Sequence, residues 1–380
     1  MMFGNIPAVL PQVRRCSEIR YTWSLRNLGV RRESCMNPRQ QRNIRLVASI
    51  VGISGLVGVG VALAQREVTA ESIFISALHG VSISFTLVML ELYLAQAAVR
   101  QWIGRLPFSL SLLLRSLVYG LVIVILHAAI HYCRLAFGAA MPANHSFMDS
   151  IELIALTAIA INFVIQMANV VGTRTLLNFF TGRYHRPRQE SRFVLFVDIA
   201  GSTGLAERLG GIGIHRLLDR TFRLLTGPVV DYRGEVLGYV GDELIVTWPE
   251  KIGAVDARPL RCFLAMRKAL QDAAPRLLRE FGAAPEIRGS LNLGPVIVGE
   301  IGDIKRAIVF NGDTMNAGSR LEELSRTVEG GFLVARAAIE RFDAAAPVAL
   351  HDLGPMPIRG RANAIAVMGL EQPEIRARLP

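Results

Sequence analysis

Cysteine is scarce in this chain of 380 residues. The four cysteines lie far apart, and no two of them have a CxxC or other metal-ligand spacing. They are Cys16, Cys35, Cys133 and Cys262. The pattern argues against a cysteine-based metal site and is typical of scattered, reduced thiols.

Lysine is scarcer still, although the chain is strongly basic. The only lysines are Lys251, Lys268 and Lys305, so the formal net charge of +11 comes almost wholly from arginine. A basic chain can bind nucleic acid. Here, however, the arginines cluster before and between apolar segments, which is typical of membrane proteins. We therefore predict no nucleic-acid partner and predict association with a lipid bilayer.

Long apolar runs fill much of the first half of the chain. Hydrophobic residues make up 51% of the sequence, and the mean hydropathy is +0.37, which is high for a soluble protein. Four runs cover residues 46–65, 73–95, 110–133 and 151–171. Each is close to the ~20 residues that cross a bilayer as a helix. We therefore expect a block of four transmembrane helices.

Basic residues in the loops indicate the orientation of these helices. Two arginines lie between the second and third runs, and five follow the fourth, whereas the other loops carry few. The arginines are Arg100, Arg105, Arg174, Arg183, Arg186, Arg188 and Arg192. Because positively charged loops stay on the cytoplasmic side, we predict a multi-pass protein of the inner or plasma membrane with both termini in the cytoplasm.

Composition divides the chain into four predicted segments. Residues 1–45 form a basic, acid-poor tail, which also fits a transit peptide, and Met36 is an alternative start. Residues 46–172 form the membrane domain, and residues 173–192 form a basic, amphipathic linker. From 193 to 372, strands alternate with amphipathic helices, which predicts an α+β domain with a βαββαβ core.

Two aspartates of this domain stand at the ends of predicted strands. Asp198 ends the apolar strand in FVLFVDIAGST, and Asp242 lies with Gly241 at a tight turn in GYVGDELIVTW. Carboxylates on adjacent strand ends suit two hard cations with oxygen ligands. Two such metals assist an in-line phosphoryl displacement. The alternative is that Asp198 only caps a helix and Asp242 only makes a hairpin turn.

A helix is expected directly after Asp198. Ser202 and Thr203 are its candidate caps. Backbone N–H groups at a helix N-terminus bind phosphate groups. The predicted nucleotide-binding residues are therefore Ala200, Gly201, Ser202 and Thr203, together with Gly241.

A second polar pair lies in NGDTMNAGSRLEEL. Asn316 and Arg320 are four residues apart, so they share one face of a predicted helix. An amide and a guanidinium that project together suit a sugar and a phosphate. The alternative is a solvated helix face in which Arg320 pairs with Glu323.

Taken together, these motifs resemble the class III adenylate and guanylate cyclases. The FVDIAGST strand, the YVGDE hairpin, the GSLNLGPVIVGEIGD strand pair and the GDTMNAGSRLE helix occur in the order of that family. The resemblance runs from about residue 193 to residue 342. The membrane half and the GRYHRPR connector resemble the membrane-bound cyclases of bacteria.

The resemblance implies a ferredoxin-like domain that works as a head-to-tail homodimer on ATP. Asp198 and Asp242, with the carbonyl of Ile199, would bind two Mg²⁺ or Mn²⁺ ions. Asn316 would orient the ribose, and Arg320 would stabilise the transition state. Both would come from the partner chain, so an isolated monomer is expected to be inactive.

The chain departs from the family pattern where the purine is read. The family often has lysine at the position of Gly238 and aspartate or threonine at that of Val309. Lys305 lies nearby as a possible substitute, although it also fits a plain surface lysine. Pro295 stands where some relatives have a phosphate-binding arginine. The metal and transition-state positions are intact, so we predict an active adenylate cyclase.

Three alternatives follow from these departures and from the shared fold. A guanylate cyclase would differ only in the base that it accepts. A diguanylate cyclase shares the VGDEL turn, but Val240 and Leu244 do not fit its signature, and NAGSR has no role there. A catalytically silent membrane receptor or scaffold would keep the fold without turnover.

Overall fold

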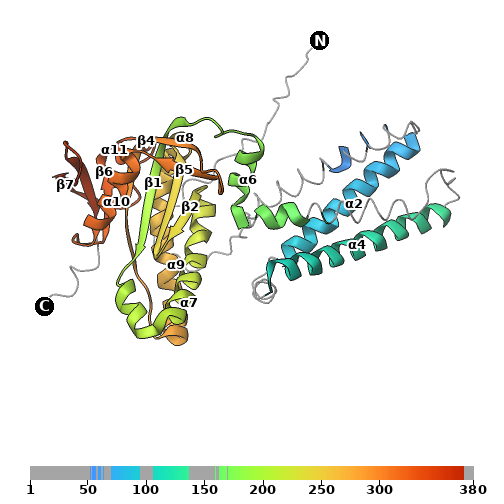
Figure 1. Cartoon of the computed structure of the whole chain (residues 1–380), viewed down its shortest axis with the longest axis horizontal. Helices are drawn as coiled ribbons and strands as arrows, with labels where there is room; N and C mark the ends of the chain where they lie inside the picture. The colour runs from blue at the N-terminus through green and yellow to red at the C-terminus, as the bar shows by residue number, and fades with distance from the viewer. Residues whose placement is uncertain are drawn as a thin grey trace, which may run out of the picture.

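The computed structural model describes residues 70–94, 106–136, 162–168 and 170–371, with isolated positions between 52 and 63 and at 159. Figure 1 shows a sheet domain, and two long helices outside it, α2 (Ala70–Leu94) and α4 (Phe108–Ala136). The other elements are α6 (Thr173–Phe180), β1 (Arg188–Ile199), α7 (Ser202–Asp231), β2 (Glu235–Val240), β3 (Glu243–Pro249), α8 (Glu250–Gly253), the 3-10 helix η1 (Val255–Ala257), α9 (Arg258–Phe281), β4 (Ile287–Ile301), β5 (Ala307–Asn311), α10 (Asp313–Ser325), β6 (Phe332–Ala335), α11 (Arg336–Glu340), β7 (Leu350–Met356) and β8 (Ile365–Leu370).

A single mixed sheet organises the domain. Its strands lie in the order β2-β3-β1-β4-β6-β8-β7, and β5 pairs with β4 outside this path. Only the β4–β6 pair is parallel among these strands. The order β1-α7-β2-β3-α9-β4 along the chain confirms the predicted βαββαβ core, and β4-β1-β3-β2 is the ferredoxin-like arrangement.

Successive side chains of β1 and β4 point to opposite faces of the sheet, where two separate hydrophobic clusters form. Phe193, Leu195 and Val197 are buried in the main core, which α7 and α9 cover. Val194 and Phe196 face the other way, into a smaller cluster. Since side chains alternate across a strand, Asp198 shares this second face, where α10 lies (Figure 1).

The helix α10 is held closely against β1 and β4. Ser290 Oγ donates to the carbonyl of Gly318 at 2.6 Å, and Asn292 Nδ2 donates to the carbonyl of Thr314 at 3.0 Å. A Cβ atom at Gly318 would lie 2.5 Å from the ring of Phe196. Only glycine allows this approach, so the sequence at Gly318 sets the distance between helix and sheet.

We expect Gly318→Ala to lower the free energy of unfolding by about 2 kcal/mol, because overpacking a buried contact forces ring or helix to move. The control is Gly204→Ala, since a Cβ atom there meets nothing within 4 Å and alanine favours a helix. Thermal unfolding of both variants provides the measurement. Equal melting temperatures would contradict this account of α10.

Two strands that were predicted separately form the single continuous strand β4. The segment GSLNLGPVIVGEIGD was expected to form a pair of strands, but β4 runs without interruption from Ile287 to Ile301. The prediction failed because β1 begins at Arg188, within the segment assigned to the linker. Its first residues pair with β4 across the Gly294–Pro295 step, with Ser191 opposite Pro295. The strand β5 was not predicted.

A buried arginine ties the linker to the sheet. Arg192 is 1% exposed and donates to Glu190 at 3.0 Å and to Glu235 at 2.7 Å. Glu235 also pairs with Arg174 of α6. These ion pairs connect α6, β1 and β2, so the predicted linker contains a helix that is attached to the domain.

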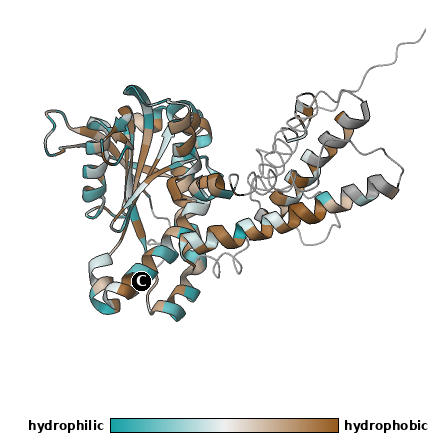
Figure 2. Cartoon of the chain, turned by 45° about the vertical axis from the view of Figure 1, so that its right-hand side comes forward, coloured by the Kyte–Doolittle hydropathy of each residue, from teal (hydrophilic) through white to brown (hydrophobic). Residues whose placement is uncertain are grey.

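The apolar helices match part of the membrane prediction. Among the described residues, one helix, Phe108–Ala129 within α4, is long and apolar enough to cross a membrane, and Gly80–Leu90 of α2 is a shorter apolar stretch. Figure 2 shows the middle of α4 as hydrophobic. The runs at 46–65 and 151–171 lie largely outside the described residues. The four-helix block is therefore not confirmed.

Contacts between the apolar helices are both apolar and polar. Tyr119 and Ile123 of α4 are buried against Leu87 and neighbouring residues of α2. Asn162, in the fourth predicted run, donates to the carbonyl of Leu112 at 3.0 Å and to the hydroxyl of Ser116 at 2.7 Å. Such side-chain hydrogen bonds are common between membrane helices.

Candidate active site

Asp198 lies in the middle of a row of charged residues across the sheet. Its register partners are Glu243 on β3 and Arg288 on β4. Its residue surface is only 3% exposed. The strand order thus brings three charged side chains, separate in the sequence, onto the face that α10 covers.

Asp242 joins this row from the β2–β3 turn. Val240 pairs with Glu243, so Gly241 and Asp242 form a two-residue turn. Gly241 has a φ of 63°, and Asp242 is not among the residues of positive φ. This is the pattern of a type II′ hairpin, whose first turn position favours glycine. The turn brings the carboxyl of Asp242 close enough to Asp198 to raise the pKa of Asp198.

Burial and neighbouring carboxyls raise the pKa of Asp198 and Glu243. Burial raises the pKa of Asp198, the hydrogen bond from Arg288 opposes this, and the nearby Asp242 raises it further. Burial, with the charges of Glu322, Asp198 and Asp242, raises the pKa of Glu243 to about 7. Crowded carboxyls of this kind hold excess negative charge that a cation would neutralise.

Two arginines and two glutamates of the site were not predicted from the sequence, and these are Arg288, Arg326, Glu243 and Glu322. Arg288 Nε donates to Asp198 Oδ2 at 2.9 Å, and Arg326 Nη2 lies 3.6 Å from the same oxygen. Glu322 of α10 is 4% exposed and lies beside both arginines. Burial and the charge of Asp198 raise its pKa, while the two arginines lower it. The i,i+4 spacing of Glu322 and Arg326 was the only signal in the sequence.

The helix after Asp198 begins differently from the prediction. Its N-cap is Gly201, in the left-handed conformation, and no side chain caps it, so the prediction of Ser202 and Thr203 as caps is wrong. The N–H of Ala200 donates to the carbonyl of Glu286 at 2.9 Å. It continues the β1–β4 pairing and is not available to a phosphate. The first-turn N–H groups of Ser202 and Thr203 have no intrahelical partner.

Ile199 reaches the site only through its backbone. Its side chain is 1% exposed and belongs to the main core, on the opposite face from Asp198. A metal ligand at this position would be the carbonyl oxygen, as the resemblance implies.

Asn316 and Arg320 lie away from the aspartates of the same chain. Arg320 and Glu322 are two residues apart on α10, which places them about 200° apart around the helix axis. Glu322 faces Asp198, so Arg320 and Asn316 face outward. Arg320 Nη1 bonds both carboxylate oxygens of Glu323 at 3.0 Å. Within a single chain, the site therefore contains Asp198 and Asp242 but not Asn316 and Arg320.

The candidate purine-reading positions offer little side-chain chemistry. Gly238 lies at an irregularity of the β2–β3 pairing, and a Cβ atom there would meet nothing within 4 Å. Val309 of β5 pairs with Gly299 of β4 and is partly buried, while Lys305 is exposed. The space beside Gly238 is open, and glycine itself offers no side chain to recognise a base.

The donor set fits divalent metal ions. Within the described part of the chain, no group of three or more His, Cys, Asp or Glu side chains is arranged to hold a metal. Asp198 and Asp242 supply two adjacent carboxylates instead. Mg²⁺ is commonly held by one or two carboxylates and completes its octahedral shell with water and substrate phosphate. The repulsion between the two carboxyls also favours a cation.

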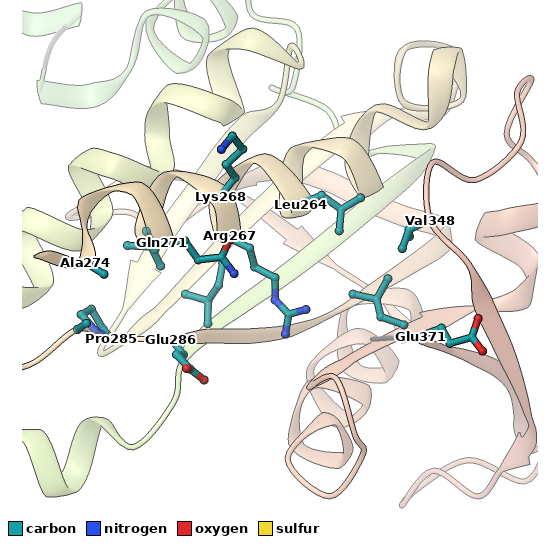
Figure 3. A pocket seen from close by; sticks show the side chains of 13 residues that line it. Leu264, Arg267, Lys268, Gln271, Ala274, Pro285, Glu286, Val348 and Glu371 are labelled. Carbon is teal, nitrogen blue, oxygen red and sulfur yellow. The ribbon is translucent and has the colours of Figure 1, made fainter. Parts of the chain in front are cut away.

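A cavity of about 550 Å³ lies elsewhere, between α9, the start of β4 and the end of β8 (Figure 3). Leu270, Ile287 and Leu370 contribute apolar lining, and the guanidinium of Arg267 lies between helix and strands. Ile287 belongs to the core on the α7 and α9 face, whereas Arg288 faces α10. The cavity includes none of the predicted site residues.

The sheet domain is similar to a known protein family. Residues 185–368 match the adenylate and guanylate cyclase catalytic domain. Adenylate cyclase 2 of Rhizobium meliloti is 36% identical over 208 residues, which cover 55% of this chain and 57% of that protein. An uncharacterised protein of Mycobacterium tuberculosis, Rv1319c, is 28% identical over 139 residues, 35% of this chain and 24% of that protein. The chain thus spans little more than half of the first relative.

Solved structures share the fold. A bacterial light-regulated adenylyl cyclase superimposes with a TM-score of 0.50 at 21% identity, covering 60% of this chain and 66% of that one. At this identity the likeness concerns the fold alone.

Proposed function

Residues 185–368 match the adenylate and guanylate cyclase catalytic domain, and on that premise we propose that this protein is an adenylate cyclase. It would convert ATP to 3′,5′-cyclic AMP and pyrophosphate. The observation that carries the proposal is the meeting of Asp198 and Asp242 on one face of the sheet, beside Arg288 and Arg326. The name of the Rhizobium meliloti relative supports ATP as the substrate.

The reaction is an intramolecular phosphoryl transfer. The ribose 3′-oxygen forms a bond to the α-phosphorus, and the bond from that phosphorus to the bridging oxygen of the β-phosphate breaks. Pyrophosphate leaves, and the hydroxyl proton passes to water. Catalysis of such a step depends mainly on positioning and on charge stabilisation.

The residues of one chain would bind and orient the triphosphate. Two Mg²⁺ or Mn²⁺ ions, held by Asp198, Asp242 and the carbonyl of Ile199, would supply Lewis acidity at the reacting phosphate. Arg288 and Arg326 would then donate to phosphate oxygens, because guanidinium and phosphate form strong, paired hydrogen bonds. The N–H groups of residues 201–203 and the turn at Gly241 would line the same phosphates.

A second copy of the chain would complete the site. Asn316 and Arg320 face away from the aspartates of their own chain, and Arg320 is half-exposed. In a head-to-tail homodimer they would reach the ATP of the partner chain. There Asn316 would orient the ribose, and Arg320 would exchange Glu323 for the charge that develops on the phosphate.

The N-terminal half would anchor this dimer in a membrane. The apolar stretch Phe108–Ala129 supports the anchor. Four helices, with both termini in the cytoplasm, would bring two catalytic domains together at high local concentration.

The site must also select between adenine and guanine. Gly238 and Val309 do not supply the polar side chains that distinguish adenine from guanine, so a guanylate cyclase is the second candidate. We expect the purified chain with Mn²⁺ to form cyclic AMP from ATP, with cyclic GMP from GTP as a slower product. Chromatographic identification of the products provides the test. Cyclic GMP alone would identify a guanylate cyclase, and no turnover of either nucleotide would favour a silent scaffold.

A further inference from the structure

Glu322 is a buried carboxylate that no predicted role uses. It is 4% exposed, and its Oε1 atom is buried and accepts no hydrogen bond. Arg288 Nε lies 3.9 Å from Oε1, and Arg326 Nη2 lies 3.6 Å from Oε2. The same two guanidiniums lie against Asp198. Two carboxylates thus enclose two guanidiniums at the edge of the proposed metal site.

The backbone holds Glu322 in this place. Hydrogen bonds from Ser290 and Asn292 fasten α10 to β4, and Gly318 lies directly on the ring of Phe196. Glu322 follows Gly318 by one helical turn, so it faces the sheet as Gly318 does. The docking of α10 therefore fixes the backbone of Glu322 beside the two arginines.

We propose that Glu322 is a positioning residue of the nucleotide site, which holds Arg288 and Arg326 beside Asp198 and leaves Asp198 free to bind a metal ion. This inference rests on the proposed cyclase function. When a divalent cation engages Asp198, the two guanidiniums lose that carboxylate as a partner. Glu322 remains as their counter-charge and keeps them in place for the phosphates of the substrate.

The charges predict what happens without Glu322. Asp198 would then be the only carboxylate within ion-pairing distance of either guanidinium among the described contacts. Both arginines would converge on it and compete with the metal ion. Packing alone does not explain a glutamate here, because an unpaired buried carboxylate oxygen is unfavourable and an apolar side chain would avoid it.

Mn²⁺ binding to the nucleotide-free, 380-residue chain tests this role without any need for turnover. We expect Glu322→Gln, which keeps the shape and removes the charge, to weaken Mn²⁺ binding about tenfold. Arg326→Gln should have the opposite effect, because it removes a competitor for Asp198. The double variant should bind Mn²⁺ within about threefold of the unmodified chain, since one charge of each sign is lost. Electron paramagnetic resonance of free Mn²⁺ provides the measurement.

Glu340→Gln is the matched control, because Glu340 is exposed on α11 and is not one of the site residues. It should leave Mn²⁺ binding unchanged. The proposal is overturned if Glu322→Gln binds Mn²⁺ like the unmodified chain, or if Arg326→Gln does not tighten binding, a result that holds even where Glu322→Gln fails to fold. A double variant as weak as Glu322→Gln alone would also overturn it. If the unmodified chain binds no Mn²⁺, the proposed metal site itself fails.

Discussion

Asp198→Asn is expected to lower the rate of cyclic AMP formation about 1000-fold, a loss at the upper end for one electrostatic group of an active site. Asparagine keeps the size of the side chain but carries no charge. It cannot neutralise a metal ion together with Asp242, and it leaves Arg288 without its strong acceptor. The measurement is the initial rate with saturating ATP and Mn²⁺.

The control for this substitution is Asp219→Asn on α7. Asp219 is exposed and pairs only with Arg223 among the described ion pairs, so the same chemical change there should leave the rate within twofold. The melting temperature of both variants shows whether they are folded. A folded Asp198→Asn chain that keeps a tenth of the activity would contradict the metal assignment.

Mixing two inactive chains is expected to restore activity. In Asp198→Ala the metal-binding half of the site is lost, and in Arg320→Ala the half that faces outward on α10 is lost. In a head-to-tail dimer of the two, one site contains both substitutions and the other contains neither. A random mixture should therefore recover about a quarter of the unmodified activity, because half of the dimers are mixed and each has one intact site.

The result depends on which residues share a site. Arg320 and Asp198 of the same chain face different directions, and this is the basis of the prediction. As a control, Asp198→Ala mixed with Asp242→Ala should stay inactive, because both substitutions damage the same half. Recovery in that control, or its absence with Arg320→Ala, would contradict the shared site.

The central residues of the site were readable from local patterns. Asp198 follows a run of apolar residues that predicts a buried strand, and Asp242 follows a glycine at a turn. Both signals lie within about ten residues of the aspartate, and the strand period and the turn chemistry are local properties. The resemblance to the class III cyclases then implied that the two aspartates bind the same metal ions. Asn316 and Arg320 were likewise found by their helical spacing.

Other predictions failed where distant pairing overrode a local signal. Gly294 and Pro295 are typical turn residues, yet β4 continues through them, because the start of β1 lies alongside. Ala200 belongs to a helix start by composition, but its N–H bonds to the carbonyl of Glu286, the residue directly before β4. Ser202 and Thr203 are good caps in general, whereas Gly201 takes the cap position in a left-handed conformation.

The sequence was sufficient for the α+β class of the sheet domain, for the position of Asp198 at a strand end and Asp242 at a turn, and for the helix that carries Asn316 and Arg320. The predicted block of four transmembrane helices is not confirmed. The sequence did not reveal that Arg288 lies against Asp198, because 90 residues separate the two. Nor did it reveal that Glu322 is buried between Arg288 and Arg326. Those contacts arise from the register of β1 on β4 and from the close approach of α10 at Gly318. Register and helix docking depend on packing across the whole sheet, and no short window of sequence carries that information.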